Sequence, residues 1–366
     1  MDPLLSSTDR PSGVPECRSR SGLDADELCD SISLSAAALR QLAGASFLVT
    51  GATGWFGTWL LDFLCAADDV LGLGIRIAAV SREPEDFLSR FEGFRGEERI
   101  SWIRSDVRQL NVRSQGYSHV IHAAAASSEK GGDLSPRQQF DTIIEGTRRA
   151  IACAGGSCKS LLLLSSGAVY GPAAPGAARF MDGHSGGPDP SLPRNVYAEG
   201  KRAAEQLCAI AAGEGTPVRI ARCFAFVGPH MPFDRHFAIG NFIADAVRGR
   251  PIRIRSDGSP QRSYLYMSDL MRALVLILVD GTIGRTYNVG SDVGLTIKEL
   301  AERVNLVVGG RGVVLDGDVS DPGNRYVPDT TRLANELKFV PAVPLDTAIA
   351  RTAAWYRAQL SRPMPS

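Results

Sequence analysis

Short apolar runs alternate with longer amphipathic stretches over most of this chain. Apolar runs of four to six residues are typical of buried strands, whereas apolar positions three and four residues apart are typical of helices. Strands separated by helices predict β-α-β units and therefore an α/β fold, a Rossmann doubly wound parallel sheet. The predicted strands are Ser46–Thr50, Arg76–Val80, Ile100–Arg104, His119–Ala123, Ser160–Leu164 and Val218–Cys223, and the helices among them Thr58–Ala67, Asp141–Cys153 and Val196–Ala212.

The alternation is less regular at both ends of the chain. Residues 1 to about 33 show no periodicity, and a short helix, Ser35–Leu42, follows. We therefore expect residues 1–44 to be a flexible N-terminal extension with a short helix. Residues 45–225, with about 265–291, would form the Rossmann domain, and residues 226–264 and 292–366 a smaller α+β lobe over the edge of the sheet where such folds bind ligands. The later predicted elements are Phe237–Arg248, Ile252–Arg255, Ser268–Asp280, Tyr287–Val289, Thr296–Val307 and Asp346–Leu360.

A glycine-rich loop joins the first strand to the first helix. Gly51, Gly54 and Gly57 allow a tight turn, a close approach of the backbone to a pyrophosphate, and close packing of the helix on the strand. The N-terminus of the helix then faces the phosphates with its partial positive charge. The pattern is weak alone but follows a strand and opens a helix, so we expect it to bind a dinucleotide through Gly51, Thr53, Gly54, Trp55, Phe56 and Gly57.

The end of the second strand bears on the choice between NAD and NADP. An acidic residue that binds the adenosine ribose is usual there, but this chain has Ser81 and Arg82. An arginine can pair with a 2′-phosphate, which favours NADP slightly over NAD. The alternative is a solvated arginine, with Glu83 or Glu85 turned towards the ribose. Further cofactor contacts are expected from Asp106, Val107, Ala123, Ala124 and Ala125, which follow the third and fourth strands.

Three residues form the candidate catalytic set. Tyr197 and Lys201 are four residues apart on one predicted helix and therefore share a face. The ammonium of Lys201 and the nicotinamide ring both favour the phenolate, which lowers the pKa of Tyr197 towards working pH. Tyr197 could then exchange a proton with a substrate hydroxyl, while Lys201 also binds the nicotinamide ribose. Ser166, after a later strand, could donate a hydrogen bond to the reacting oxygen.

The motifs in this order resemble the extended short-chain dehydrogenase/reductase family, in particular its nucleotide-sugar epimerases and dehydratases. The resemblance runs from about residue 45 to 360. It implies that Ser166, Tyr197 and Lys201 are catalytic, that Asp269 is structural, and that the protein is a homodimer built on helices such as Asp141–Cys153 and Val196–Ala212. It also implies substrate contacts from Ser127, Ser166, Asn241, Arg262 and Arg325. The segments that carry it are TGATGWFG (50–57), SSGAVYG (165–171), YAEGK (197–201), ARCFAFVGP (221–229), SDGSPQRSYLYMSDL (256–270), YNVGS (287–291) and RYVPDTTRL (325–333).

Two of the positions that depart from the family pattern bear on the reaction. The 4,6-dehydratases carry an Asp-Glu pair directly after the Ser166 position, and decarboxylases of nucleotide-sugar acids a glutamate at 168, but here these residues are Gly167 and Ala168. We therefore expect an NAD(P)-dependent epimerase that acts at C4 of a nucleoside-diphosphate sugar. An NADPH-dependent reductase of a 4-keto sugar is the alternative, and a dehydratase, a decarboxylase or a non-catalytic dinucleotide-binding regulator is less favoured.

Composition limits the other classes of function. The 40 basic and 40 acidic residues balance, which gives no electrostatic reason to expect nucleic acid or a membrane as partner. No apolar run approaches the length of a membrane span, and no signal-peptide core is found. Seven scattered cysteines suit a cytoplasmic protein. No metal is expected, because His119 and His122 would point to opposite faces of a strand. His230 and His236 flank a loop that could contact the sugar.

Overall fold

A seven-stranded parallel sheet is the centre of the molecule. The computed structural model describes residues 17–111, 116–124, 134–173, 176–183, 186–233, 237–317 and 324–361. Every strand predicted up to residue 225 is present, with bounds that differ by two residues or fewer. The sheet order is β11-β6-β5-β4-β1-β2-β3, with β1 Ser46–Thr50, β2 Arg76–Ser81, β3 Ile100–Arg104, β4 His119–His122, β5 Ser160–Ser166, β6 Val218–Cys223 and β11 Thr286–Val289.

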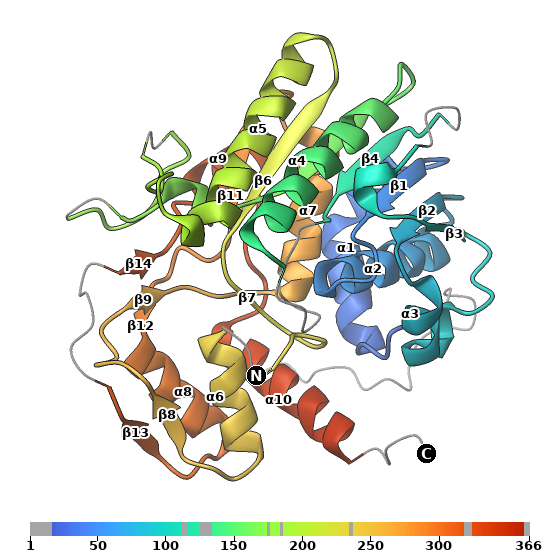
Figure 1. Cartoon of the computed structure of the whole chain (residues 1–366). Helices are drawn as coiled ribbons and strands as arrows, with labels where there is room; N and C mark the ends of the chain where they lie inside the picture. The colour runs from blue at the N-terminus through green and yellow to red at the C-terminus, as the bar shows by residue number, and fades with distance from the viewer. Residues whose placement is uncertain are drawn as a thin grey trace.

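Helices cover both faces of this sheet (Figure 1). Neighbouring strand residues point to opposite faces, so Phe47 and Val49 of β1 join one core while Leu48 joins the other. The first core is closed by α1 (Ala25–Arg40), α2 (Trp55–Leu71) and α7 (Met267–Asp280), and the second by α4 (Pro136–Cys153) and α5 (Val196–Gly213). This confirms the predicted doubly wound architecture.

The later part of the chain adds a smaller lobe, drawn in yellow to red (Figure 1). Its helices α6, α8 and α10 pack on one another, and three small sheets with the strand orders β10-β7, β12-β9-β14 and β13-β8 lie beside them. Two short helices, α3 and α9, are not predicted by the sequence pattern. The bounds are α3 Pro84–Arg90, β7 Phe226–Val227, α6 Ala238–Val247, β8 Ile252–Ile254, β9 Gln261–Arg262, β10 Leu265–Tyr266, β12 Leu295–Thr296, α8 Ile297–Val308, β13 Val313–Leu315, β14 Arg325–Tyr326, α9 Thr331–Leu337 and α10 Leu345–Leu360.

The expected flexible extension is wrong for residues 17–33. Helix α1 begins at Ala25, ten residues before the predicted start at Ser35. Leu28, Ile32 and Leu39 are fully buried, because they form one apolar stripe along the helix. The interspersed acids and serines hide this stripe in the sequence. Asp24 caps the helix by accepting from the backbone N–H of Glu27.

Residues 17–24, which we call the N-terminal strap, are anchored on α2. The buried Asp62 accepts hydrogen bonds from the backbone N–H groups of Arg20 and Ser21, at 2.7 and 3.0 Å, and from the Ser19 hydroxyl at 2.7 Å. Arg20 in turn pairs with Asp69 and with Glu97. These bonds satisfy buried polar groups that would otherwise destabilise the fold. The strap is therefore part of the packed structure.

Glu27 connects α1 to the smaller lobe. Its carboxylate accepts from the Tyr266 hydroxyl at 3.0 Å and lies 3.7 Å from Arg351 of α10. Burial raises the pKa of Glu27 to about 7, since a buried carboxylate loses its hydration.

Among the helices that the structure describes, none has the length and apolar character needed to cross a bilayer.

Candidate active site

The glycine-rich loop closes tightly against the end of β4. Gly51 has φ +71°, and a Cβ there would lie 2.7 Å from the carbonyl carbon of Ala123. A Cβ on Gly57 would lie only 2.3 Å from the carbonyl oxygen of Gly51. β1 lies between β4 and β2, so the direction in which strands are added reverses at this point. Ligands of doubly wound sheets bind in the crevice beside such a reversal.

The loop also presents a site for an anion. Helix α2 begins at Trp55, and its N-cap residue Gly54 offers no side chain to the backbone N–H groups of the first turn. A Cβ on Gly54 would meet no atom nearer than the Gly51 carbonyl oxygen at 3.4 Å. Uncapped N–H groups and the helix dipole together favour a phosphate. The loop therefore fits the pyrophosphate of a dinucleotide.

Trp55 and Phe56 direct their side chains into the protein rather than towards this loop. The indole N–H groups of Trp55 and Trp59 both donate to the carbonyl oxygen of Pro229, at 2.8 and 2.9 Å. The ring of Phe56 packs on that of Phe226, with the centroids 5.3 Å apart. These side chains join α2 to the smaller lobe, so a cofactor contact by either residue is left to its backbone.

Polar groups at or just after the ends of β1, β2 and β3 form two local pairs. Thr53 and Ser81 hydroxyls are 3.1 Å apart, and the Arg82 side chain is exposed. The carboxylate of Asp106 accepts from the Arg108 guanidinium at 2.9 Å, and this hydrogen bond holds the pKa of Asp106 below its usual value. Val107 packs beside α4, within 3.0 Å of the position of a Cβ on Gly146.

His122, the last residue of β4, has a structural role in the core. Its Nδ1 lies 2.7 Å from the Thr50 hydroxyl and its Nε2 lies 3.3 Å from the Thr147 hydroxyl. The Thr50 hydroxyl also accepts from the backbone N–H of Ala124, at 3.3 Å. Complete burial lowers the pKa of His122 to about 3, so the ring is neutral. Within the described ranges, no cluster of three or more His, Cys, Asp or Glu could hold a metal.

Helix α5 places Tyr197 and Lys201 beside the end of β5. Lys201 is 2% exposed, donates to the Leu164 carbonyl oxygen at 2.7 Å, and has its Nζ 6.0 Å from the centroid of the Tyr197 ring. Burial lowers the pKa of Lys201 to about 8. Ser166, the last residue of β5, accepts from the backbone N–H of Ala168 at 3.2 Å. The structure thus brings the ammonium near the phenol and places the serine two residues beyond the carbonyl that the lysine contacts.

Two aromatic residues at this site were not found from the sequence. The Tyr326 hydroxyl lies 3.4 Å from the Ser166 Oγ, and the rings of Tyr326 and Phe224 pack with centroids 4.7 Å apart. A Cβ on Gly167 would lie 2.7 Å from the Phe224 ring and 2.8 Å from the Tyr326 hydroxyl. These two side chains therefore fill the space that any side chain at position 167 would need. The sequence gives no sign of this role for Phe224 or Tyr326, because they come close to Ser166 and Gly167 only in the folded chain.

Three of the expected substrate contacts lie in the smaller lobe. Arg262 of β9 donates to the Asn324 side chain at 2.9 Å, and Arg325 of β14 donates to the Ala177 carbonyl oxygen at 2.7 Å. Asn241 lies in the first part of α6. Ala125 and Ser127 lie outside the described residues.

Two other expectations about single residues can be compared with the structure. Asp269 is fully buried, accepts from the backbone N–H groups of Ala342 and Val343, and pairs with Arg272, which confirms its structural role. His230 packs against Phe91 and Trp355 and lies 3.2 Å from the Ser21 hydroxyl, so it contacts the N-terminal strap. His236 lies outside the described residues.

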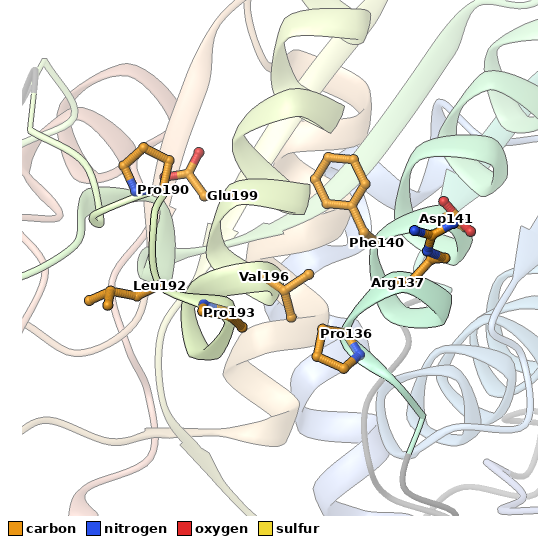
Figure 2. Close-up of a pocket in the computed structure, with 9 residues that line it drawn as sticks. All are labelled: Pro136, Arg137, Phe140, Asp141, Pro190, Leu192, Pro193, Val196 and Glu199. Carbon is orange, nitrogen blue, oxygen red and sulfur yellow. The ribbon is translucent and has the colours of Figure 1, made fainter.

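A separate groove lies between the N-terminal ends of α4 and α5 (Figure 2). Figure 2 shows Phe140 and Val196 facing the space between the two helices. Phe140 is 37% exposed, so part of the groove surface is apolar. None of the residues assigned above to the cofactor or to catalysis lines this groove.

Comparison with known proteins places the chain in a family. The model of the NAD dependent epimerase/dehydratase family matches residues 47–290, well over half of the chain. The protein belongs to this family. It is 28% identical to UDP-glucuronic acid decarboxylase 1 of Arabidopsis thaliana over 316 residues. The aligned region covers 85% of this chain and 69% of the relative. It is also 28% identical to dTDP-glucose 4,6-dehydratase of Streptomyces griseus over 322 residues, an aligned region that covers 84% of this chain and 93% of the relative.

Solved structures agree on the fold. UDP-glucuronic acid 4-epimerase from Bacillus cereus, in complex with UDP-glucuronic acid and NAD, superposes with a TM-score of 0.70 at 21% identity, over 86% of this chain and 99% of that one. The resemblance to the extended nucleotide-sugar enzymes is confirmed, and this protein is an enzyme of an NAD-dependent nucleotide-sugar family. The named relatives catalyse a decarboxylation, a dehydration and an epimerisation, so membership leaves the reaction open.

Proposed function

We propose that this protein is an NAD(P)-dependent C4 epimerase of a nucleoside-diphosphate sugar. The observation that carries this proposal is the filled space at Gly167, where the Phe224 ring and the Tyr326 hydroxyl leave no room for a side chain. The family's dehydratases and decarboxylases use an acid at position 167 or 168, and Ala168 supplies none either. Epimerisation needs only the transfer of a hydride and a proton, for which the remaining groups suffice.

The chemistry follows from the placement of three side chains. Tyr197 would remove the proton from the ring hydroxyl and later return it to the same oxygen. The ammonium of Lys201, held on the Leu164 carbonyl oxygen, would favour the phenolate of Tyr197. The Ser166 hydroxyl would donate to the oxygen as its charge changes. The dinucleotide, bound through the loop of Gly51 to Gly57, would accept the hydride from the carbon and return it to the other face of the ring.

An NADPH-dependent reductase of a 4-keto sugar is the second candidate. Arg82 at the end of β2 favours it, because the exposed guanidinium could pair with a 2′-phosphate, and an acid for the ribose is missing at Ser81. The same three catalytic groups would serve, with Tyr197 as the proton donor. The UDP-glucuronic acid 4-epimerase from Bacillus cereus was solved in complex with NAD, and a preference for NADP is our proposal for this chain.

We also propose the wider arrangement that the family implies. Arg262, Arg325 and Asn241 of the smaller lobe would hold the substrate diphosphate, with the division into two units as expected from the sequence. The exposed apolar groove between α4 and α5 supports a homodimer on these helices. A cytoplasmic location is consistent with the seven cysteines, all in the described part of the chain and none in a disulfide.

Two assays test these proposals. The protein is incubated with a panel of UDP- and dTDP-sugars, and the products are separated and weighed by mass spectrometry. An epimerase gives a product of unchanged mass with no net consumption of NADPH, whereas a reductase consumes NADPH in proportion to an added 4-keto sugar. Loss of water or carbon dioxide from the substrate would contradict both. Arg82→Ser should lower the affinity for NADPH and leave the affinity for NADH unchanged. An equal loss of affinity for both would reject the 2′-phosphate contact.

A further inference from the structure

Tyr326 reaches the catalytic serine from a distant part of the chain. β14 pairs in parallel with β9, which sets Tyr326 opposite Arg262 in the small sheet of the second lobe. The side chain then crosses to β5, where its hydroxyl lies 3.4 Å from the Ser166 Oγ. Phe224 packs on the Tyr326 ring and Phe180 lies beyond it, with ring centroids 4.7 and 6.4 Å away. This packing fixes the phenol in one position.

The hydrogen bonds of Ser166 limit the direction of its proton. A serine hydroxyl has one hydrogen to donate and two lone pairs that can accept. One lone pair accepts from the backbone N–H of Ala168 at 3.2 Å. A phenol is a stronger acid than an aliphatic alcohol, and therefore the better donor of the Tyr326–Ser166 pair. With Tyr326 donating, both lone pairs are occupied and the Ser166 hydrogen is left for a third partner.

We propose that Tyr326 is a positioning residue, whose hydroxyl donates to Ser166 and thereby directs the Ser166 proton to the reacting oxygen of the substrate. Tyr326 performs no proton exchange of its own. Burial raises the pKa of Tyr326 above its usual value, as does the nearby phenol of Tyr197, so its hydroxyl keeps its proton over the working range. The site therefore holds two phenols with separate tasks, Tyr197 as acid and base and Tyr326 as a fixed donor.

This inference rests on the proposed function, and Tyr326→Phe is its direct test. The variant keeps the ring that packs on Phe224 and removes only the hydroxyl. We expect kcat for the nucleotide sugar to fall about tenfold, which corresponds to about one hydrogen bond in the transition state, while KM stays within about twofold. An unchanged kcat would overturn the proposal.

A double-mutant cycle separates positioning from direct contact with substrate. In a Ser166→Ala background there is no serine to orient, so Tyr326→Phe should change kcat by less than about twofold. A full tenfold loss in that background would show that Tyr326 acts without Ser166 and would reject the inference. Tyr287→Phe is the matched control, because the Tyr287 hydroxyl bonds Glu336 at the edge of the sheet and should affect stability with kcat unchanged.

The same four proteins also test the contact without any turnover. Urea unfolding of the wild type, Ser166→Ala, Tyr326→Phe and the double variant gives the coupling between the two hydroxyls. Additive effects on the unfolding free energy would mean that the bond is absent and the inference wrong. Coupling in a protein that converts no nucleotide sugar would instead reject the proposed function and retain Tyr326 as the partner of Ser166.

Discussion

The two sides of the candidate active site are built in different ways. The cofactor side comes from one β-α-β unit, in which Gly51 to Gly57 follow β1 directly and pack on the end of β4. The substrate side brings together Ser166, Phe224 and Tyr326, and the first and last of these are 160 residues apart in sequence. Local backbone geometry therefore determines the first side, whereas tertiary packing determines the second. Damage to one side should leave the function of the other measurable.

Tyr197→Phe should give the largest difference between the effect on catalysis and the effect on cofactor binding. Loss of the phenol removes the proposed acid and base, so kcat for the nucleotide sugar should fall about a hundred- to ten-thousand-fold. The dinucleotide dissociation constant, measured by calorimetry, should change by less than about threefold, because the loop of Gly51 to Gly57 is untouched. A variant that retained full turnover would refute the catalytic assignment.

Gly57→Ala should have the converse effect. The added Cβ would lie 2.3 Å from the Gly51 carbonyl oxygen, so the loop must shift and dinucleotide affinity should fall at least about tenfold. Gly72→Ala is the control, since Gly72 ends α2 with φ +61° and a Cβ there has no neighbour within 4 Å. It should cost about 1 kcal/mol of stability with unchanged affinity. If both variants bound cofactor equally well, the tight-turn argument would fail.

Gly167→Ala tests the packing of the substrate side. Its Cβ would overlap the Phe224 ring and the Tyr326 hydroxyl, so we expect a stability loss of about 1–3 kcal/mol and a lower kcat. Dinucleotide affinity should not change. Phe224→Leu in the same chain should restore part of the loss by removing the ring atoms that clash. Thermal unfolding and steady-state kinetics of the single and double variants would decide this, and a stable, fully active Gly167→Ala would show that the space is open.

The smallest effect concerns pH and links the two sides. Burial lowers the pKa of Lys201 to about 8, below the ordinary value of lysine, so its positive charge is present below pH 8 and is lost above it. Accordingly kcat/KM, which reports the free enzyme, should decline as pH rises through about 8. Lys201→Arg keeps its charge at high pH and should lose this decline, at a lower absolute rate. A profile that stays flat to pH 10 in the wild type would contradict the role of the ammonium.

The sequence predicted the cofactor side more completely than the substrate side. Strand, glycine loop and helix are adjacent in the chain, so the order of Val49, Gly51 and Gly57 carries their geometry. Tyr326 could not be found in this way, because β14 is two residues long and has no periodicity to detect. Its role depends on the pairing of β14 with β9, a contact that no local pattern encodes.

Polar residues in buried elements account for the other differences between the sequence-based expectations and the structure. Asp26, Ser31 and Ser33 stand between the apolar positions of α1 in the sequence, so the stripe of Leu28, Ile32 and Leu39 is hard to recognise there. The hydrogen-bond partners of His122 could not be found from the sequence, since Thr50 and Thr147 lie on different elements. In both cases the residues are buried by contacts with distant parts of the chain, and a local sequence pattern does not show such contacts.

The clamp formed by Asp62, Arg20 and the strap has a practical consequence for dissecting this protein. The family model starts at residue 47, but a chain shortened to that point would expose the surface that covers Leu28 and Ile32. It would also remove the backbone and hydroxyl donors that hydrogen-bond Asp62, which is 0% exposed in the intact chain. The homologous region is thus smaller than the folding unit. Domain exchanges with relatives should carry residues 17–44 together with α2.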